Sequence, residues 1–280
     1  MMSKARRKLK TILSIAWNLI PQRKNPKSIP VLCYHSVNEA WDSDIEPIKS
    51  SLFEQHMDFL KNSYQPISLS VWMDSILHDK PVPKNAVLIT FDDGYVDNYE
   101  TIFPIILARG IPVCIFVVTE FVKGNIKLVE NEEFKAITVE HMIKMRDSGL
   151  VSFGAHTCTH RVLSTLGNDE IYSEVTKSID TLNRWLGCAT KAFAYPFGQY
   201  RHIGRAGIDV VNHSSAVVAF STQWGVSSSE CNHFLMPRMI INSGDSVKDL
   251  SDKLKGKYGY LSVLHSFTGG FRAQLEKLGI

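Results

Sequence analysis

The sequence predicts an α/β protein whose parallel sheet closes, or nearly closes, into a barrel with helices outside. Apolar, β-rich runs alternate with segments of helical spacing along most of the 280 residues, which is the pattern of repeated βα units. Several apolar runs also end in His or Asp, and active groups of such folds gather where the strands end. Because only the linker around residues 21–28 looks like a boundary, we expect a leader over residues 1–27 and one domain over residues 28–280.

The first half of the domain alternates strand and helix. Residues 29–35 are an apolar run typical of a buried strand, and residues 51–64 place their apolar side chains at helical spacing. A serine able to cap a helix opens the short helix expected over residues 68–77. Residues 86–91, AVLITF, predict a second strand, and the helix expected over residues 98–110 ends at a glycine.

The alternation continues through the second half. Strands are expected over residues 112–118 and 151–156, and between them a threonine opens and a glycine ends a helix over residues 138–149. A long amphipathic helix over residues 169–187 precedes a strand over residues 191–198 that ends in a proline turn. Three strands and one helix complete the set: residues 216–221, 235–241, 246–256 (the helix) and 261–266.

The charge distribution argues against nucleic-acid binding. The formal net charge is +3, but residues 1–27 carry eight basic side chains and no acid, which leaves 23 basic against 28 acidic side chains in the remainder. A nucleic-acid-binding domain needs a positively charged surface that neutralises phosphates. We therefore expect no nucleic-acid partner.

The five cysteines indicate a reducing compartment. Their number is odd, they are widely scattered, and no pair has CxxC spacing. This pattern argues against a disulfide framework and against a cysteine-type zinc site.

Residues 1–27 admit more than one interpretation. Their positive start and short apolar run are similar to a signal peptide, but no small-x-small cleavage site follows. The apolar run over residues 11–20 is too short to span a bilayer. Its spacing favours an amphipathic helix on an anionic membrane face, and a solvated basic tail is an equal alternative. We expect a cytoplasmic protein, at the membrane face in the first case; a secreted or membrane-anchored protein is the alternative.

Four expected strands end in groups able to do chemistry. They are His35, the Asp92–Asp93 pair, His156 and His265. A lone histidine is more often structural than functional, but the carboxyl ends of parallel strands converge on one rim. We therefore expect these side chains to share a site.

Two of these strand ends predict a metal site. The adjacent carboxylates Asp92 and Asp93 repel unless a cation or a proton compensates. FGAHTCTH places His156 and His160 four residues apart, so that a helical turn would bring both imidazoles to one face. Two imidazoles and one carboxylate make a three-ligand site for a divalent cation such as Zn2+. Gly94 permits a turn that lets one acid bind the cation while the other stays free as a base.

Three motifs carry a family resemblance. TFDDG (residues 90–94), HTCTH (residues 156–160) and YPFG (residues 195–198) resemble the first three motifs of the polysaccharide deacetylases, the NodB-homology or carbohydrate esterase 4 group. The resemblance spans roughly residues 29–270 and is nearest the circularly permuted poly-N-acetylglucosamine deacetylases, because VLCYHSV resembles their N-terminal strand. It implies a distorted (β/α)7 barrel of the NodB-homology type. It also implies a metal-dependent hydrolase that removes N-acetyl groups from amino sugars and releases acetate.

The resemblance implies roles for individual residues. Asp92 corresponds to the general base, and the backbone N–H of Phe197 to the donor that holds the oxyanion. Tyr195 and Pro196, in the same motif as Phe197, are expected to bind substrate or orient the base. Zn2+ is the expected cation, with Co2+ or Ni2+ as alternatives. The implied metal ligands are Asp93, His156 and His160.

Two departures from the family pattern concern the base and the acid. Ala194 stands where members usually carry an arginine that orients the base. Arg238 in LMPRMII is the candidate substitute, and an ordinary surface arginine is the alternative. Most members keep the general acid as the histidine of an LxH motif on the last strand, where this chain has SVLHS. We expect His35 to be the acid, with His265 in reserve.

Three functions are open, of which the third, a purely membrane-peripheral scaffold, rests on residues 1–27 alone. The first is an N-deacetylase acting on a bacterial surface polysaccharide or its lipid-linked precursor. The second is a catalytically inactive carbohydrate-binding module on the same barrel, which Ala194 favours and the metal-ligand set disfavours. The expected partners are an N-acetylated glycan or glycolipid and, through residues 1–27, a membrane surface.

Overall fold

The computed structural model describes residues 28–42 and 46–259. The leader over residues 1–27, the expected strand over residues 261–266 and with it His265 lie outside the described residues. None of the helices in the described part combines the length and the apolarity that membrane crossing requires.

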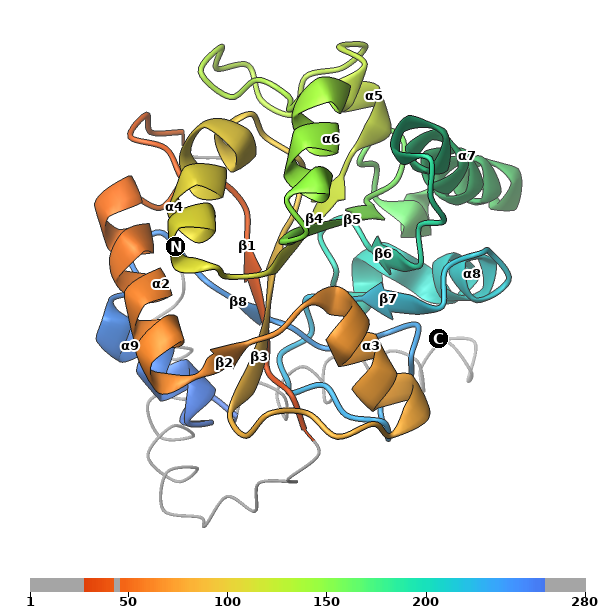
Figure 1. Cartoon of the computed structure of the whole chain (residues 1–280). Helices are drawn as coiled ribbons and strands as arrows, with labels where there is room; N and C mark the ends of the chain where they lie inside the picture. The colour runs from red at the N-terminus through yellow and green to blue at the C-terminus, as the bar shows by residue number, and fades with distance from the viewer. Residues whose placement is uncertain (1–27, 43–45, 260–280) are drawn as a thin grey trace, which may run out of the picture.

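Seven parallel strands make up the central sheet (Figure 1). Their order is β7–β6–β5–β4–β3–β1–β8, and a two-residue strand, β2 (Gln65–Pro66), pairs with β3 outside this path. The seven strands are β1 (Val31–Tyr34), β3 (Ala86–Phe91), β4 (Val113–Val117), β5 (Val151–Ala155), β6 (Ala192–Ala194), β7 (Val218–Phe220) and β8 (Met239–Ile240).

One segment brings the two edges of the sheet together. Met236 forms a parallel bridge with Phe220 of β7, and β8, which follows it, pairs with β1. The N–H of Ser221 donates to the carbonyl of Met236 over 2.8 Å, and the N–H of Ile241 donates to that of Cys33 over 2.9 Å. The expected distorted (β/α)7 barrel is therefore confirmed.

Helices surround the barrel (Figure 1). At the start of α3 the Ser68 hydroxyl accepts the N–H of Val71, and at the start of α6 the Thr138 hydroxyl accepts the N–H of His141, as the sequence predicts. The α-helices of the described part are α2 (Ser50–Ser63), α3 (Leu69–His78), α4 (Phe103–Arg109), α5 (Thr119–Val122), α6 (Val139–Asp147), α7 (Asn168–Leu186), α8 (Tyr200–Asn212) and α9 (Val247–Leu254).

Three helical segments differ from expectation. The helix expected over residues 98–110 begins as a π-helix, η1 (Asn98–Ile102), before it continues as α4. The four-residue helix α5 and the longer α8 were not expected. Two glycines lower the helix propensity of α8, and one of them, Gly204, takes φ 69° and kinks the helix.

Strand alternation decides which side chains face the inside of the barrel. An inner cluster of apolar residues contains Val31 of β1 and Leu88 of β3, whereas their direct neighbours belong to the cluster between sheet and helices. Because side chains alternate with a period of two, counting on from Val31 reaches Cys33 and His35. The same count from Leu88 reaches Thr90 and then Asp92. The inner face thus continues from an apolar core into the reactive groups at the carboxyl ends of the strands.

Candidate active site

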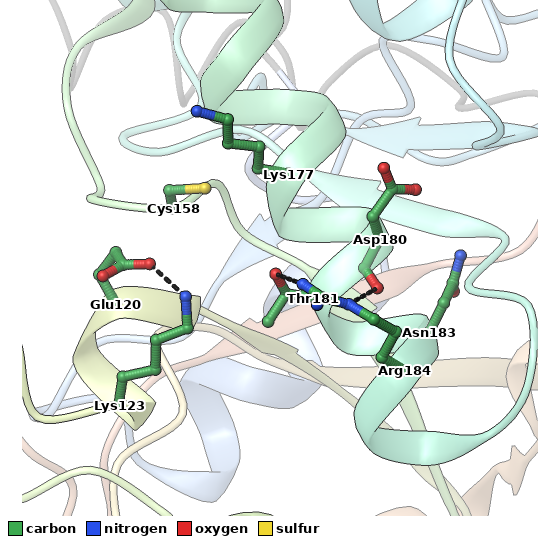
Figure 2. Close-up of a pocket in the computed structure, with 8 residues that line it drawn as sticks. All are labelled: Glu120, Lys123, Cys158, Lys177, Asp180, Thr181, Asn183 and Arg184. Atoms are coloured by element: carbon green, nitrogen blue, oxygen red, sulfur yellow. Dashed lines mark hydrogen bonds and ion pairs between the residues drawn. The ribbon is translucent and has the colours of Figure 1, made fainter.

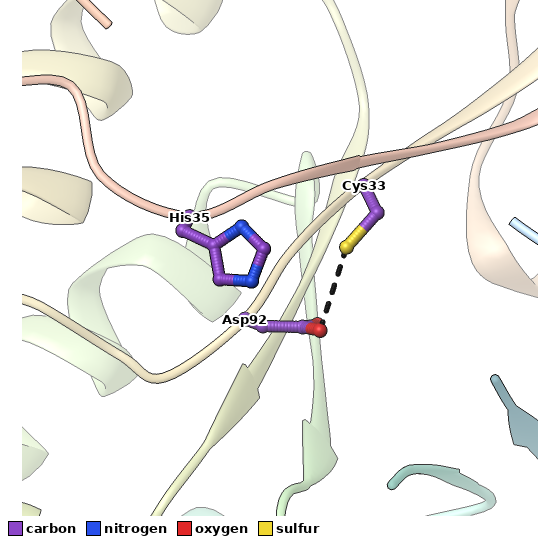
Figure 3. A group of neighbouring side chains, drawn as sticks. All are labelled: Cys33, His35 and Asp92. Atoms are coloured by element: carbon purple, nitrogen blue, oxygen red, sulfur yellow. Dashed lines mark hydrogen bonds between the residues drawn. The ribbon is translucent and has the colours of Figure 1, made fainter. Parts of the chain in front are cut away.

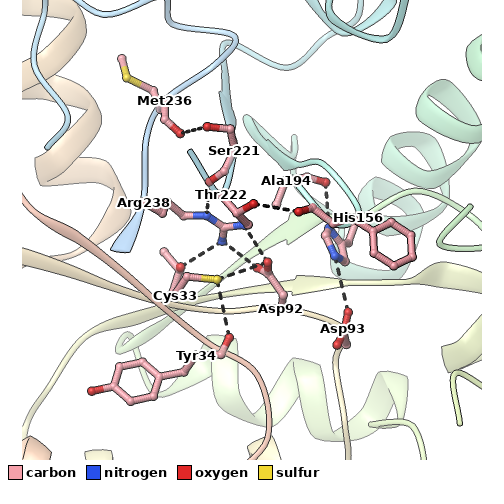
Figure 4. Close-up of polar contacts among 12 residues, drawn as sticks. Cys33, Tyr34, Asp92, Asp93, His156, Ala194, Ser221, Thr222, Met236 and Arg238 are labelled. Carbon is pink, nitrogen blue, oxygen red and sulfur yellow. Dashed lines mark hydrogen bonds and ion pairs between the residues drawn. The ribbon is translucent and has the colours of Figure 1, made fainter. Parts of the chain in front are cut away.

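Asp92 follows β3 directly and meets an arginine inside the barrel (Figure 4). Nη1 and Nη2 of Arg238 donate to Oδ1 and Oδ2 of Asp92 over 2.7 and 2.6 Å. The two side chains are 0% and 2% exposed. This two-bond contact fixes the plane of the carboxylate, which is what an orienting arginine does.

Arg238 is built into the barrel interior. Its Nε donates to the carbonyl of Ser221 over 3.0 Å, and Nη1 also donates to the hydroxyl of Thr90 over 3.1 Å. The guanidinium carbon lies 5.6 and 5.9 Å from the ring centres of Phe116 and Phe220, within reach of cation–π attraction. The alternative of an ordinary surface arginine is therefore wrong.

The Arg238 cation controls the ionisation of Asp92. Ala194, where the family pattern has arginine, belongs to the inner cluster on β6, so the guanidinium reaches the same interior from the segment before β8. Burial alone would raise the pKa of Asp92, but the charges of Arg238 and His156 outweigh it and hold that pKa below its ordinary value. Asp92 is accordingly an ionised carboxylate at neutral pH.

Cys33 and His35 complete the surroundings of Asp92 (Figure 3). The Cys33 thiol donates to Oδ2 of Asp92 over 3.4 Å, and burial raises its pKa well above the ordinary value. One atom each of Cys33, His35 and Asp92 lie within 4.8 Å of one another. Although this spacing would suit a cation, Arg238 already binds both oxygens of Asp92. The expected acid, His35, therefore lies beside the expected base.

A tight turn separates Asp93 from Asp92. The φ angles of Asp93 and Gly94 are 77° and 82°, and the N–H of Gly94 donates to the carbonyl of Asp92 over 3.0 Å. A Cβ at Gly94 would lie 2.8 Å from Cγ1 of Val117. Both the backbone conformation and the packing therefore demand glycine here, and the expected turn is confirmed.

The two histidines approach Asp93 from an irregular loop. His156 follows β5, and the loop continues to His160 without a helical turn. Thr157 and His160 have positive φ angles of 65° and 59°. The expectation that a helical turn aligns the imidazoles is wrong, because a left-handed residue interrupts a right-handed helical path. The loop nevertheless places both rings at Asp93, with their centres 5.0 Å apart.

Both imidazoles converge on one oxygen of Asp93. The Nε2 atoms of His156 and His160 lie 3.5 and 3.3 Å from Oδ1 of Asp93. Nδ1 of His156 lies 2.8 Å from the carbonyl oxygen of Ala194 (Figure 4). Since a carbonyl oxygen only accepts, Nδ1 carries a proton, and Nε2 is the ring nitrogen that faces Asp93. Oδ1 of Asp93 is buried, yet it accepts no hydrogen bond from the described residues.

Burial and charge set the protonation of this group. Burial would raise the pKa of Asp93, but the two imidazoles outweigh it and hold that pKa well below its ordinary value. Burial lowers the pKa of His160 to about 4. Burial also opposes charge on His156, but Asp92 and Asp93 outweigh it and raise the pKa of His156. An ionised carboxylate and a neutral imidazole are the forms that bind metals.

These three side chains fit a divalent cation. Two ligand atoms that each lie about 2.1 Å from one tetrahedral ion are ~3.4 Å apart, which matches the separations between Oδ1 of Asp93 and each Nε2. The donor set, two nitrogens and one carboxylate oxygen, is one that zinc accepts. A cation would also give the buried Oδ1 the partner that it lacks among the described residues.

A cleft of about 610 Å3 reaches Asp93, one of its histidines and His35. His35 lines it next to the base, and Asp93 and His160 line it on the metal side. Phe197 also lines it, with φ 59°, a side chain that is 49% exposed and a ring centre 4.9 Å from that of His160. The oxyanion role of the Phe197 N–H stays a prediction.

Tyr195 and Pro196 do not reach this cleft. Tyr195 is fully buried, and its hydroxyl donates to the carbonyl of Phe234 over 2.9 Å. Pro196 is buried as well. The expected substrate-binding or base-orienting role of Tyr195 and Pro196 stays a prediction, and their burial does not favour a side-chain contact with substrate. The physical reason for the burial of Tyr195 is strand alternation, since it follows the inward Ala194 and therefore packs between sheet and helices.

Cys33 and Thr90 are site residues that the sequence analysis did not single out. Cys33 donates to Asp92, and the Thr90 hydroxyl accepts from Arg238 while it donates to a backbone carbonyl. Each lies two positions before a reactive side chain, His35 or Asp92, on the same face of its strand. That period of two is the signal by which they could have been found.

Comparisons with known proteins agree with this geometry. Residues 79–209 match the family model described as polysaccharide deacetylase. YxkH of Bacillus subtilis (strain 168), whose name assigns it provisionally to the polysaccharide deacetylases, is 28% identical over 224 residues, which cover 80% of this chain and 75% of that protein. The poly-beta-1,6-N-acetyl-D-glucosamine N-deacetylase of Escherichia coli (strain K12) is 31% identical over 136 residues. That match covers 45% of this chain but only 20% of the Escherichia coli protein.

Two solved structures share the fold. The deacetylase PplD of Streptococcus pyogenes, in complex with acetate, superimposes with a TM-score of 0.73 at 23% identity and covers 82% of this chain and 99% of its own. IcaB from Ammonifex degensii gives a TM-score of 0.67 at 22% identity, with 84% and 97% covered. The family match over residues 79–209 and the relatives show that the chain is similar to the polysaccharide deacetylases, and the two solved structures show that it shares their fold.

Proposed function

We propose that this protein is a metal-dependent N-deacetylase that hydrolyses N-acetyl groups on amino sugars of a bacterial surface polysaccharide. One observation carries the proposal. At a single cleft, a carboxylate oxygen of Asp93 that accepts no hydrogen bond from the described residues faces two imidazoles, while the adjacent Asp92 is held by a buried arginine. Amide hydrolysis uses both parts, a site that activates water and a base that takes its proton.

The relatives support the choice of substrate. One of them is named for poly-beta-1,6-N-acetyl-D-glucosamine, and we infer that an N-acetylglucosamine polymer is the substrate here. A lipid-linked amino-sugar precursor is the second candidate, because the leader has the composition of a membrane-surface segment. A cytoplasmic location at the membrane face, through residues 1–27, is proposed on the sequence alone.

Asp93, His156 and His160 would hold the cation, for which Zn2+ is the first candidate and Co2+ or Ni2+ are alternatives. When bound, the cation supplies Lewis acidity that polarises a carbonyl oxygen and lowers the pKa of water. The hydrogen bond between Nδ1 of His156 and the Ala194 carbonyl holds the imidazole in the orientation that a ligand needs.

Asp92 would accept the proton of the attacking water. Arg238 keeps it ionised and fixes its plane, and Oδ1, which accepts only from Nη1 of Arg238 among the described residues, retains a second lone pair for the incoming proton. A positioned base of this kind contributes about 10²–10⁴-fold to a rate.

His35 would protonate the leaving amine, because it lies in the cleft beside the base. His265, outside the described residues, is the reserve for this role. The backbone N–H of Phe197 would hold the oxyanion of the tetrahedral intermediate, next to His160 on the metal side. The acid and the oxyanion donor would thus act from different walls of one cleft.

The inactive carbohydrate-binding module is the weaker alternative. Ala194 was the observation that favoured it, since the orienting arginine is missing from that position. Arg238 supplies a guanidinium to Asp92 from another segment, so Ala194 no longer argues for loss of activity.

The test is acetate release from N-acetylglucosamine oligomers and from a lipid-linked amino sugar, followed by the mass loss of one acetyl group. We expect release by the purified full chain, loss of release on chelation, and recovery when Zn2+ is added back. Asp92→Asn should reduce release about 10²–10⁴-fold, and Asp58→Asn, at an exposed ion pair on α2, should not. Release that is indifferent to the chelator or to Asp92→Asn contradicts the proposal, and glycan binding without release favours the inactive module.

A further inference from the structure

The loop that carries both histidines needs support from outside itself. Residues 156–160 lie outside regular secondary structure. Thr157 and His160 hold left-handed backbone conformations that are unfavourable for residues with a Cβ. Such conformations persist only where the surroundings impose them.

Glu174 of α7 holds this loop from one side. Its Oε2 accepts the N–H groups of Cys158 and Thr159 over 3.0 and 2.9 Å, and its Oε1 accepts the Thr159 hydroxyl over 2.6 Å. The Glu174 residue is 4% exposed, and the Arg161 side chain 3.4 Å away is 47% exposed. Burying a carboxylate is costly unless hydrogen bonds replace water, and here the loop supplies three of them.

The short helix α5 holds the loop from the other side. The N–H groups of Thr119 and Glu120 donate to the carbonyls of Thr157 and Cys158 over 3.2 and 2.9 Å. Figure 2 shows Cys158 on its loop beside α5 and α7. Two carbonyl groups of the loop thus accept N–H groups of α5, and two of its own N–H groups donate to Glu174.

We propose that Glu174 is a positioning residue of the metal site. Its carboxylate fixes the backbone of residues 158–159, and this holds Nε2 of His156 and of His160 at Asp93. The inference rests on the proposed function only in that these three side chains hold a cation, and it assumes nothing about the substrate. Glu174 lies on a helix outside the HxxxH motif, so the motif itself does not point to it.

The experiment measures Zn2+ affinity of the metal-free full chain by competition with a chromophoric chelator, and the visible spectrum of the Co2+-loaded chain. Groups that orient metal ligands change metal affinity about 10–100-fold when mutated, so Glu174→Ala should weaken Zn2+ binding by that factor and alter the Co2+ spectrum. Glu174→Gln keeps an oxygen for the two N–H groups and should restore most of the affinity.

A matched control lies on the same helix. Asp180→Ala removes a carboxylate that lines the pocket beside the loop but does not bond the loop (Figure 2). It should leave both the Zn2+ affinity and the Co2+ spectrum unchanged. If Asp180→Ala weakened Zn2+ binding as much as Glu174→Ala, the specific role of Glu174 would be overturned.

Two outcomes separate this inference from the proposed function. If the wild-type chain binds Zn2+ and Glu174→Ala binds it equally, with an unchanged Co2+ spectrum and only a lower Tm, Glu174 is merely structural and the inference fails alone. If the wild-type chain does not bind Zn2+, the proposed function fails first. Should Glu174→Ala not fold, Glu174→Asp, whose side chain is one methylene shorter, takes its place with the same expected loss and the same overturning result.

Discussion

The two carboxylates that stand side by side in the sequence have opposite surroundings. Asp92 accepts two hydrogen bonds from Arg238 and one from Cys33. Oδ1 of Asp93 is buried beside it, yet accepts none from the described residues. Protein groups alone satisfy Asp92, which we call the base side of the proposed site, whereas the side around Asp93, which we call the metal side, has the donor set that a divalent cation prefers. The two side chains are chemically identical, so the difference between them comes from the groups that surround each one.

This difference predicts that substitutions on the two sides of the site have different effects, one on stability and the other on cation affinity. Removing a partner on the base side leaves a buried charge without its counter-ion, which lowers the stability of the fold. Removing a ligand on the metal side lowers cation affinity, and we expect it to cost less stability because it leaves no buried arginine charge without its partner. The variants below test whether the two sides separate in this way.

Asp93→Ala should have the largest effect on activity. Lewis-acid stabilisation is worth several kcal/mol, and a loss of about 4 kcal/mol is roughly a thousandfold in rate. We expect acetate release to fall by at least that order and Zn2+ binding to fall with it, while urea unfolding of the metal-free chain changes little. Asp147→Ala, at an exposed ion pair with Arg146, is the control. Unchanged Zn2+ affinity in Asp93→Ala would show that Asp93 is not a metal ligand, and the contrast between the two sides would fail.

Arg238→Met should have the largest effect on stability. It leaves Asp92 ionised and buried without its partner, and breaking a buried pair in this way costs about 3–5 kcal/mol. Urea unfolding measures the loss. Arg109→Met is the matched control, because Arg109 pairs with Asp58 and Glu54 at the surface, where such pairs contribute at most about 1 kcal/mol.

The double variant Asp92→Asn/Arg238→Met sharpens this result. Removing both charges leaves no unpaired ion, so we expect it to be more stable than Arg238→Met alone. If Arg238→Met cost no more than Arg109→Met, the base side would not depend on its buried pair, and the contrast with Asp93 would lose its physical basis.

Gly94→Ala tests the turn that separates the two sides. Alanine at φ 82° is strained by about 1 kcal/mol, and its Cβ would meet Val117 at 2.8 Å, which adds about 1–3 kcal/mol of overpacking. Gly110→Ala is a control with the same kind of strain, since Gly110 has φ 65° and open space around its Cβ position. Equal losses of unfolding free energy in the two variants would show that Val117 does not constrain the turn.

The sequence predicted most of the strand ends and failed where the backbone leaves regular structure. AVLITF followed by two acids indicates a strand with Asp92 at its end, because β-type runs and strand polarity are local properties. The spacing of His156 and His160 indicates a shared face only if the segment is helical. The left-handed Thr157 depends on bonds from Glu174 and α5, which are distant in sequence and invisible to periodicity.

The direction in which side chains point was the second property that could not be predicted from the sequence. Arg238 could be proposed as a partner of Asp92 because the family position, Ala194, lacks a guanidinium. Its burial between two phenylalanines could not be foreseen, since it depends on how the barrel closes. Tyr195 was expected to bind substrate or orient the base, but it directly follows the inward Ala194 of β6 and packs between sheet and helices.

Asp97 adds a third buried carboxylate to the comparison and a smaller, pH-dependent effect. Its partners are neutral: the Ser36 hydroxyl, the Asn98 side-chain amide and the backbone N–H of Val37. Burial outweighs these bonds and raises the pKa of Asp97 to about 7, whereas the charged Arg238 has the opposite effect on Asp92. Of these three acids, the one whose hydrogen-bond partners are all neutral is the one whose pKa is raised.

The sign of the effect follows from the two states. In the unfolded chain Asp97 ionises near the ordinary value of about 3.9, so between about pH 4 and pH 7 the folded chain keeps a proton that the unfolded chain loses. Stability falls as pH rises through this range, by about 2 kcal/mol between pH 5 and pH 7. Asp97→Asn stays neutral, so its unfolding free energy relative to wild type, measured in urea, should increase by that amount. Ser36→Ala removes a bond that favours the ionised form and should extend the wild-type slope to higher pH. A difference between Asp97→Asn and wild type that is constant with pH would mean that Asp97 is ionised in the folded chain without a cation, and the contrast with Asp92 would not hold.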